Sequence, residues 1–242
     1  MAISITQHHP TATNVFGEKT IMISRNGNHQ YWLGDDKKNK MPSVTGITKY
    51  ADAGSFGAGL GWAIKIVKEN DGDLNSPRGL SLQVQKEGTD LHNSIDQYIN
   101  NRTIDEDSVL FSTWLKTFAN TTFLASEQLL YHKEMLYGGT ADAFYFAPED
   151  KSGTADIVLA DWKTKERKSF ESYGPPVKDL IQISAYAKAL ESMSSIYTPQ
   201  QAKIIYLFRD NSGIEIVDVD IERYFEVFRA CHHLHTVLKS AQ

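Results

Sequence analysis

The chain contains almost no cysteine: Cys231 is the only one among its 242 residues. A single thiol excludes a disulfide between two cysteines of the chain and an iron–sulfur cluster held by four of its own cysteines. The sequence also lacks a run of about 18 apolar residues, so no membrane span or membrane partner is expected. Residues 1–10 lack the apolar stretch of a secretion signal. These absences predict a soluble protein of a reducing compartment such as the cytoplasm.

An excess of positive charge is missing as well. Lys and Arg number 25 against 30 Asp and Glu, which gives a net charge of −5. Proteins that coat nucleic acid are usually basic, so this balance argues mildly against that class. It is compatible with an enzyme that has a local basic groove, because several acids can belong to a metal site. Hydrophobic residues make up 41%, enough for the core of one large domain, with or without an appendage.

Hydrophobic periodicity divides the chain into helices and strands. Helices are expected over 62–69, 80–100, 108–120, 177–193 and 221–240. In the second of them, one stripe holds Leu80, Val84, Leu91, Ile95 and either Tyr98 or Ile99. Strands are expected over 121–130, 139–147 and 157–164, with two hairpins over 20–33 and 203–219. Turn-forming and charged residues predict loops over 71–79 and 165–178.

The most informative stretch runs over residues 138–186. Asp161 and Lys163 are two residues apart in a predicted strand, so their side chains share one face and Trp162 turns to the other. Asp142, which ends the run Gly-Gly-Thr-Ala-Asp, can join them from a neighbouring strand. Two carboxylates and a lysine at one point suit a hard divalent cation that activates water against a phosphodiester. Taken singly, each acid would more simply be a turn or ion-pair residue.

Four motifs in this order resemble the PD-(D/E)XK nuclease superfamily, and within it the RecB-like branch. They are a helical histidine, a G-x-x-D strand end, a D-x-K strand and a Q-x-x-x-Y helix, here His92, Gly139–Asp142, Asp161–Lys163 and Gln182 with Tyr186. The likeness is greatest to exonucleases of the mitochondrial genome maintenance type and to phage single-strand DNA exonucleases. Pro42–Thr45 supports that subgroup. Any one motif is common by chance, whereas the ordered set is specific, and it covers roughly residues 40–210.

The resemblance implies an α/β fold with a restriction-endonuclease-like core, in which helices flank a central mixed β-sheet. It also implies an N-terminal hairpin and a helical arch over the active site. Accordingly, we expect residues 1–40 to form a hairpin and lead-in. Residues 41–79 would form the arch or another element that admits the substrate. Residues 80–242 would form the nuclease core, all within one compact domain.

The resemblance also implies a set of metal ligands. His92, Asp142, Asp161 and the Trp162 backbone carbonyl would bind one or two Mg²⁺ or Mn²⁺ ions, and the histidine would favour Mn²⁺ somewhat. Glu127 is a weaker candidate ligand, because glutamates on strands usually face solvent. Two residues would share the catalysis with the metal ligands Asp142 and Asp161: Lys163 would position the attacking water or stabilise charge on the phosphorus, and Gln182 would orient Lys163 or the scissile phosphate.

A further set of residues is expected to contact DNA. On the predicted helix over 62–69, Trp62, Lys65 and Lys68 recur every three residues, which suits stacking of bases and pairing of phosphates. An ordinary amphipathic helix with solvated lysines explains them equally well, and the resemblance favours the DNA track. The other expected contacts are Ser43, Thr45, Thr164, Lys165 and Tyr186. Tyr186 could instead be a core residue of its helix.

The sequence therefore predicts a metal-dependent DNA exonuclease that acts on single-stranded DNA or single-stranded tails. A role in phage-type recombination, replication or DNA degradation, in the host cytoplasm, would be in keeping with the resemblance. Two alternatives stay open. One is a structure-specific or restriction-type endonuclease, because the D-x-K core is shared. The other is a non-catalytic DNA-binding subunit that keeps the fold, although such members usually lose the lysine or an acid.

Overall fold

A computed structural model describes residues 23–25, 28–33, 39–52, 56–147, 156–194 and 197–241. Its centre is a five-stranded sheet in the order β4-β5-β6-β7-β8. The strands are β4 (Phe123–Tyr131), β5 (Gly138–Phe146), β6 (Ile157–Lys165), β7 (Gln201–Phe208) and β8 (Ile214–Asp218). Only β6 and β7 run parallel, and the other neighbours are antiparallel. The predicted α/β architecture with a central mixed sheet is therefore confirmed.

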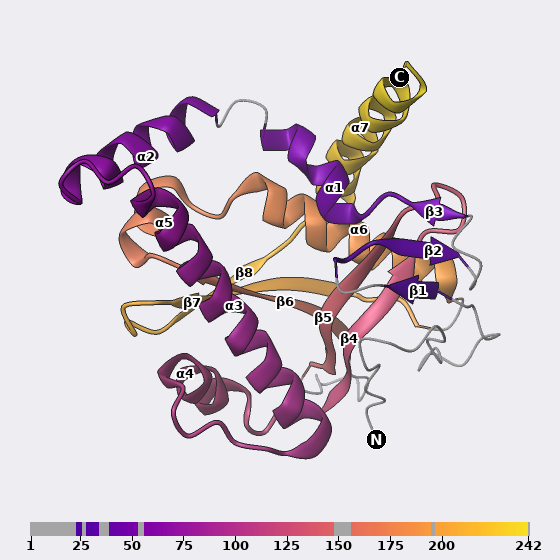
Figure 1. The fold of residues 1–242 in the computed structure, drawn as a ribbon. Coiled ribbons are helices and arrows are strands. Elements are labelled where there is room, and N and C mark those ends of the chain that lie inside the picture. Colours follow the sequence, from indigo (N-terminus) through magenta and orange to yellow (C-terminus); the bar gives the residue numbers. More distant parts are fainter. Residues whose placement is uncertain are drawn as a thin grey trace.

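Helices cover both faces of this sheet (Figure 1). On one face lies α6 (Val177–Met193), with α1 (Val44–Thr48) and α7 (Ile221–Ser240) beside it. On the other lie α3 (Ser76–Asn101) and α4 (Val109–Phe118). Strand β6 alternates between two buried clusters, with Leu159 in the α6 cluster and Trp162 in the α3–α4 cluster. The period of two along a strand thus sends Asp161 and Lys163 to the α6 face.

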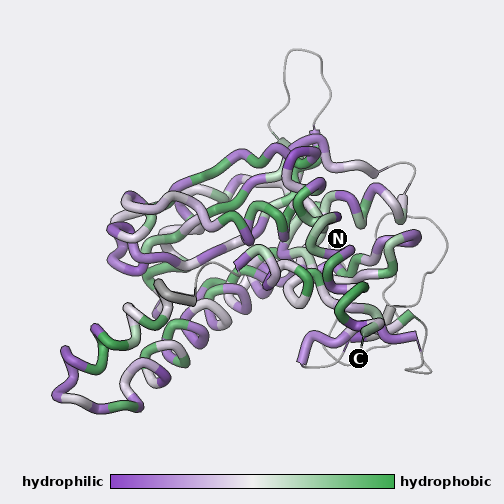
Figure 2. The backbone as a smooth tube through the Cα atoms, turned by 90° about the horizontal axis from the view of Figure 1, so that it is seen from above, coloured by the Kyte–Doolittle hydropathy of each residue, from purple (hydrophilic) through white to green (hydrophobic). Residues whose placement is uncertain are grey.

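The N-terminal half of α3 and the preceding α2 (Phe56–Glu69) form a helical hairpin that projects from the body (Figure 2). Both helices start earlier than predicted. Helix α3 begins at Ser76 with a proline in its first turn, where the missing N–H costs nothing. The predicted apolar stripe is buried only at its C-terminal end, through Leu91 and Ile95, whereas Leu80 is 37% exposed. That correction follows from the projection, which carries the first half of α3 away from the sheet.

The predicted N-terminal hairpin is confirmed. Strands β1 (Ile23–Arg25) and β2 (Tyr31–Leu33) pair antiparallel, and β3 (Lys40–Met41) adds a third strand. The turn residues 26–27 lie outside the described residues. After β3, Ser43 forms a bridge with Gly138 at the start of β5, and a short 3-10 turn, η1 (Lys49–Asp52), follows α1. The small sheet is therefore attached to the edge of the core next to the Gly-Gly motif.

One predicted loop is a helix. Residues 167–173 form α5 (Arg167–Tyr173) between β6 and α6. Phe170 packs against Tyr206 and Phe208, and the Arg167 guanidinium lies 3.9 Å from the Phe208 ring centroid. These contacts with β7 stabilise a helix that charge composition alone did not indicate. Among the described residues, no helix is both long and apolar enough to span a bilayer.

Candidate active site

Strands β5 and β6 separate where the two predicted acids lie. Their pairing ends at Ala143 and Ala160, and Asp142 and Asp161 are the next residues on each strand. Beyond that point the Asp142 carboxylate accepts a hydrogen bond of 2.8 Å from the Trp162 backbone N–H. The Asp142 side chain thus satisfies the Trp162 N–H, which has no partner in the β5–β6 ladder. The separation places two carboxylates on neighbouring strands where the ladder opens, as the sequence predicted.

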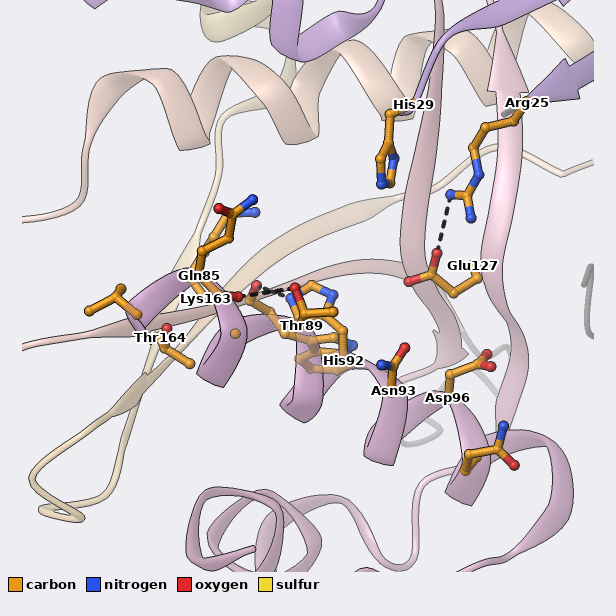
Figure 3. A pocket seen from close by; sticks show the side chains of 14 residues that line it. Arg25, His29, Gln85, Thr89, His92, Asn93, Asp96, Glu127, Lys163 and Thr164 are labelled. Carbon is orange, nitrogen blue, oxygen red and sulfur yellow. Dashed lines mark hydrogen bonds and ion pairs between the residues drawn. The ribbon is translucent and has the colours of Figure 1, made fainter. Parts of the chain in front are cut away.

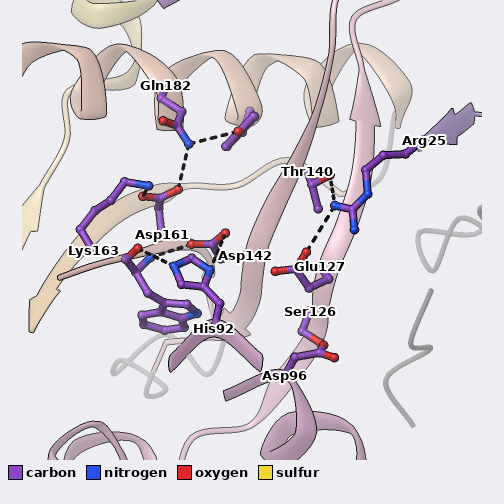
Figure 4. Close-up of polar contacts among 12 residues, drawn as sticks. Arg25, His92, Asp96, Ser126, Glu127, Thr140, Asp142, Asp161, Lys163 and Gln182 are labelled. Carbon is purple, nitrogen blue, oxygen red and sulfur yellow. Dashed lines mark hydrogen bonds and ion pairs between the residues drawn. The ribbon is translucent and has the colours of Figure 1, made fainter. Parts of the chain in front are cut away.

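Three ligand-type side chains converge on the α3 side of this opening (Figure 4). Ligand atoms of His92 on α3, Glu127 on β4 and Asp142 on β5 all lie within 4.8 Å of one another. Two carboxylates and one imidazole form a donor set suited to Mg²⁺ or Mn²⁺. His92 and Asp142 were predicted as ligands, and Glu127, the weaker candidate, lies beside them. The ligand roles themselves stay predictions.

The contacts of His92 also fit a cation. Its Nε2 lies 2.9 Å from the Trp162 carbonyl oxygen, and its Nδ1 lies 3.5 Å from Asp142 Oδ1. If Nε2–H donates to the carbonyl, the Nδ1 lone pair of a neutral ring faces the carboxylate. Either a proton on Nδ1 or a cation close by is then needed to make that contact favourable. The Trp162 carbonyl, also predicted as a ligand, thus orients the histidine in this structure.

Glu127 reaches the site through an unusual backbone. Its φ is +47°, a left-handed value that is uncommon for a residue other than glycine and often occurs at functional sites. Burial raises the pKa of Glu127 to about 7, and the nearby Asp142 carboxylate adds to the rise, whereas His92 and Arg25 oppose it. Two carboxylates held this close favour the binding of a positive charge between them.

A polar network fixes α3 against β4 beside the three ligand-type residues. The Ser126 hydroxyl donates to Asp96 Oδ1 at 2.6 Å, and the Asn100 amide donates to both residues at 2.7 and 2.9 Å. Ser126 is the neighbour of Glu127 on β4, and Asp96 is one helical turn beyond His92 on α3. The network therefore holds the helix that carries His92 in a fixed position relative to Glu127.

The second half of the site is an ion pair under α6. Lys163 Nζ lies 2.6 Å from Asp161 Oδ2, and the Asp161 side chain is only 1% exposed. Burial raises the pKa of Asp161 to about 7, although the Lys163 charge counteracts it. Burial also disfavours the charged form of Lys163, but Asp161, Asp142 and Asp179 outweigh it and raise the pKa of Lys163. The predicted pairing on one strand face is confirmed. That Asp161 also binds metal stays a prediction.

Asp179 is one of the carboxylates that raise the pKa of Lys163, and it was not predicted as a site residue. It is buried in the first turn of α6 and accepts a hydrogen bond of 3.1 Å from the Tyr206 hydroxyl. Tyr206 is the register partner of Lys163 across β6 and β7. A buried carboxylate therefore lies near the lysine, and its place depends on the register of strands far apart in the sequence.

Gln182 lies above the ion pair. Its amide Nε2 donates to Tyr186 Oη at 3.1 Å and approaches Asp161 Oδ1 at 3.4 Å. The Tyr186 side chain is buried, with 4% exposure. A direct contact of Tyr186 with DNA, as predicted, is at odds with that burial, because the core covers the ring. Within the structure, the Tyr186 hydroxyl contacts Gln182 instead, and contact of Tyr186 with DNA stays a prediction.

The two glycines of the Gly-Gly motif are explained by neighbouring rings. A Cβ on Gly138 would lie 2.9 Å from Tyr31 Cβ, and a Cβ on Gly139 would lie 2.3 Å from Tyr186 Cε1. Any larger side chain would push one of these rings aside. The glycines thus let the N-terminal sheet and α6 approach β5 closely on opposite sides.

A cavity of about 570 Å³ opens in front of the histidine and its acidic neighbours (Figure 3). One wall is α3, which presents Gln85, Thr89, His92, Asn93 and Asp96. The facing wall comes from the N-terminal hairpin, from which Arg25 and His29 point inward. Lys163 and Thr164 of β6 line it as well. The cavity is open and polar, and it is large enough to hold part of a nucleic-acid strand at the site.

Arg25 was missed in the sequence analysis. Its Nη1 donates to Thr140 Oγ1 at 2.8 Å and lies 3.5 Å from Glu127 Oε2. The hairpin that carries it was predicted, but where a hairpin docks depends on contacts more than 100 residues away. The sequence signal for Arg25 was the strand pattern of β1, and that pattern does not indicate which sheet the strand packs against.

The residues predicted to contact DNA are scattered. Thr164 lines the cavity, and burial lowers the pKa of Lys165. Ser43 has a structural role, because its hydroxyl caps α1 by accepting from the Gly46 N–H at 2.9 Å. Thr45 is exposed two residues later and lies 3.3 Å from the Ser43 hydroxyl. Contacts of these residues with DNA stay predictions.

The predicted row on α2 is divided. Trp62 is 41% exposed and lines a second cavity of about 560 Å³ between α2, α3 and the Glu166–Arg209 ion pair. Lys65 forms an ion pair with Glu69 of its own helix, and neither Lys65 nor Lys68 lines this cavity or the one at the site. Val84 of α3 borders both cavities. The aromatic part of the predicted track therefore lies next to the site, while its two lysines face elsewhere.

Comparisons with known proteins give only distant likenesses. No protein-family model matches the chain, and no curated protein matches it significantly. Among solved structures it is similar to one described as SSO0001, with 13% identity, a TM-score of 0.37 and coverage of 83% of this chain and 79% of that one. It is also similar to an alkaline exonuclease, LHK-Exo, from Laribacter hongkongensis, with 12% identity, a TM-score of 0.31 and coverage of 63% and 84%. A structure of LHK-Exo in complex with dAMP gives 14% identity, the same coverage and a TM-score of 0.30. At these values, the activity has to be inferred from the site.

Proposed function

We propose that the chain is a divalent-metal-dependent DNA nuclease that degrades single-stranded DNA, or single-stranded tails, from an end. One observation carries the proposal. Where β5 and β6 separate, three ligand-type residues and the ion pair of Lys163 with the buried Asp161 lie beside an open cavity. Burying the Asp161 carboxylate close to other acids is costly even with Lys163 paired to it, and phosphodiester hydrolysis can use both the carboxylates and the ammonium.

The chain's own residues would divide the work. His92, Glu127 and Asp142 would hold Mg²⁺ or Mn²⁺, which supplies Lewis-acid activation of water and neutralises charge on the phosphate. Lys163 lines the same cavity, and its ammonium would stabilise negative charge that develops on the phosphoryl oxygens. Gln182, which contacts Asp161 and Tyr186, would keep the ion pair oriented.

The preference for an end is supported by the projecting α2–α3 hairpin. Val84 links the cavity at the site to the one lined by Trp62, so a single strand could run along α3 and stack a base on the indole. A duplex is wider and stiffer than a single strand, and we expect it to be degraded poorly unless it carries a single-stranded tail.

The test uses one labelled oligonucleotide in linear and in circular single-stranded form. We expect the linear form to be degraded with Mg²⁺ or Mn²⁺, not in chelator and not with Ca²⁺, and we expect Asp142→Ala to be inactive. Efficient cutting of the circle would show an endonuclease. Binding of DNA without cleavage under every metal condition would show a non-catalytic subunit that keeps the fold.

A further inference from the structure

The N-terminal sheet contributes a cation to the proposed active site. Arg25 lies on β1, outside the five-stranded core, yet its side chain is only 11% exposed. Its Nη1 donates to Thr140 Oγ1 at 2.8 Å, and Tyr31 of the same hairpin contacts that hydroxyl at 3.0 Å. Thr140 is two residues before Asp142 on β5. The guanidinium is therefore anchored by Thr140 (Figure 4) at the edge of the cavity (Figure 3).

Arg25 is one of few positive charges available there. Among the described residues that line the cavity, Arg25 and Lys163 are the only arginine and lysine. Lys163 is engaged by Asp161 at 2.6 Å. Arg25 faces Glu127, and their nitrogen–oxygen distance is 3.5 Å. That distance is well above the roughly 2.8 Å of a good charge-assisted hydrogen bond, so the contact is loose.

Glu127 has two competing uses. Its carboxylate balances the charge of Arg25, and it is also one of the three ligand-type groups within 4.8 Å of one another. Once a cation neutralises Glu127, the charge of Arg25 is no longer compensated. Thr140 still holds the guanidinium at the cavity wall, where its planar fork suits a phosphate.

We propose that Arg25 binds a backbone phosphate of the nucleic acid, and that Glu127 engages the Arg25 guanidinium until a divalent cation occupies the site. This inference rests on the proposed function and adds to it a phosphate-binding residue and a coupling. Cation binding and substrate binding would then be cooperative, because a cation bound to Glu127 frees Arg25 to bind the phosphate.

The test is a binding experiment without cleavage. Fluorescence anisotropy of a labelled single-stranded oligonucleotide is measured in chelator and in Ca²⁺ for wild type, Arg25→Gln, Glu127→Gln and the double variant. Arg102→Gln is the control, because Arg102 lies over the Tyr98 ring at the end of α3 and does not line the cavity. Thermal melting checks that each variant folds, and Arg25→Lys keeps the charge without the fork.

We expect Ca²⁺ to tighten wild-type binding about tenfold or more, and Arg25→Gln to remove most of that gain. The slope of log affinity against log salt in Ca²⁺ should fall by about 0.7, the value for one phosphate contact on a single strand. In chelator, Glu127→Gln should tighten binding several-fold in the wild-type background and much less with Arg25→Gln. Arg25→Lys should bind between wild type and Arg25→Gln.

Two results would overturn the inference while leaving the proposed function intact. Arg25→Gln could bind and respond to Ca²⁺ like wild type, which would remove Arg25 as a ligand. Glu127→Gln could tighten binding equally in both backgrounds, which would show general charge repulsion and no coupling. If wild type binds no single-stranded DNA in Ca²⁺ and cleaves none in Mg²⁺, the proposed function fails as well.

Discussion

The two halves of the site differ in how they meet solvent. In the half under α6, the Asp161 side chain is 1% exposed and Tyr186 is 4% exposed, and Gln182 contacts both. Lys163, which is 25% exposed and reaches the cavity, pairs with Asp161. In the half along α3, the side chains of His92 and Glu127 are 27% and 26% exposed and line an open cavity. We refer to these as the buried half and the open half.

This difference separates two demands on a hydrolytic site. The Asp161 carboxylate of the buried half attracts Lys163 strongly because little water screens it, which holds the ammonium in place to stabilise a short-lived charge. Ligands in the open half must exchange ions and substrate with solvent, so partial exposure is needed there. The Asp142 carboxylate joins the halves, since one oxygen holds the Trp162 N–H of β6 and the other faces His92.

The largest expected effect comes from removing the charge of the buried half. Lys163→Ala should slow cleavage of single-stranded DNA about 100- to 1000-fold, the usual loss when one donor to a developing negative charge is removed. Binding of the same DNA in Ca²⁺ should stay within about threefold, because Lys163 is engaged with Asp161. Single-turnover rates and anisotropy measure the two quantities.

Lys86→Ala is the matched control, because that lysine is 79% exposed and, among the described residues, pairs only with Asp90 of its own helix. Its cleavage rate should equal that of the wild type. A near-normal rate for Lys163→Ala would mean that the buried half does not take part in the chemistry, and the contrast between the halves would lose its functional meaning.

A smaller effect is expected from disturbing the contacts of the buried half. Gly139→Ala would place a Cβ 2.3 Å from the Tyr186 ring and 3.2 Å from Val44. Overpacking of this kind costs about 1–3 kcal/mol, which corresponds to a fall in Tm of about 2–12 °C for a chain of this size. In contrast, a Cβ on Gly79 of α3 meets nothing within 4 Å. Gly79→Ala should keep or raise Tm by helix propensity, and equal Tm values for the two variants would contradict the close approach.

The smallest effect concerns the open half and depends on pH. The pKa of Glu127 is raised to about 7 in the folded chain from an ordinary 4.5, so the folded state holds the proton more tightly. Stability should therefore fall as pH rises from about 4.5 to about 7. Glu127→Gln cannot ionise, so in chelator its Tm should exceed that of the wild type by a few degrees at pH 8, at about 2–4 °C per kcal/mol, and by less at pH 5.

Glu69→Gln provides the comparison for this measurement, because Glu69 is 54% exposed and Lys65 is its only ionic partner in the part of the chain that the structure describes. It should show almost no change in Tm with pH relative to the wild type. If Glu127→Gln gave the same difference in Tm at pH 5 and pH 8, folding would not raise the pKa of Glu127. The open half would then be no different electrostatically from the exposed surface of a helix.

The buried half could be predicted because its geometry is local. The spacing of two between Asp161 and Lys163 fixes their common face on any strand, and the spacing of four between Gln182 and Tyr186 does the same on a helix. The structure confirms both pairings. Whether Tyr186 faces the cavity or the core could not be predicted, because it depends on how closely α6 approaches Gly139.

In the open half, the candidate ligands His92, Asp142 and Glu127 were predicted, but the backbone that positions Glu127 and the arginine beside it were not. Glu127 reaches its neighbours through a φ of +47°, and nothing about a glutamate in a strand indicates that value. Arg25 depends on a contact with Thr140, 115 residues along the chain. The helix over Arg167–Tyr173 was missed because its support comes from Phe208 on another strand.

The long reach of the Arg25 contact has a consequence for the order in which the chain folds. The hairpin contacts Thr140 across 109 and 115 residues, and closing so large a loop carries an entropic cost that nearby contacts do not bear. The helix and strand pairings of the core are mostly shorter in range and can form first. The contact of Arg25 with Thr140 should then be the last contact of the site to form during folding, and the first to break when the protein opens locally. Hydrogen exchange at β1 and β2 would report that opening separately from unfolding of the core.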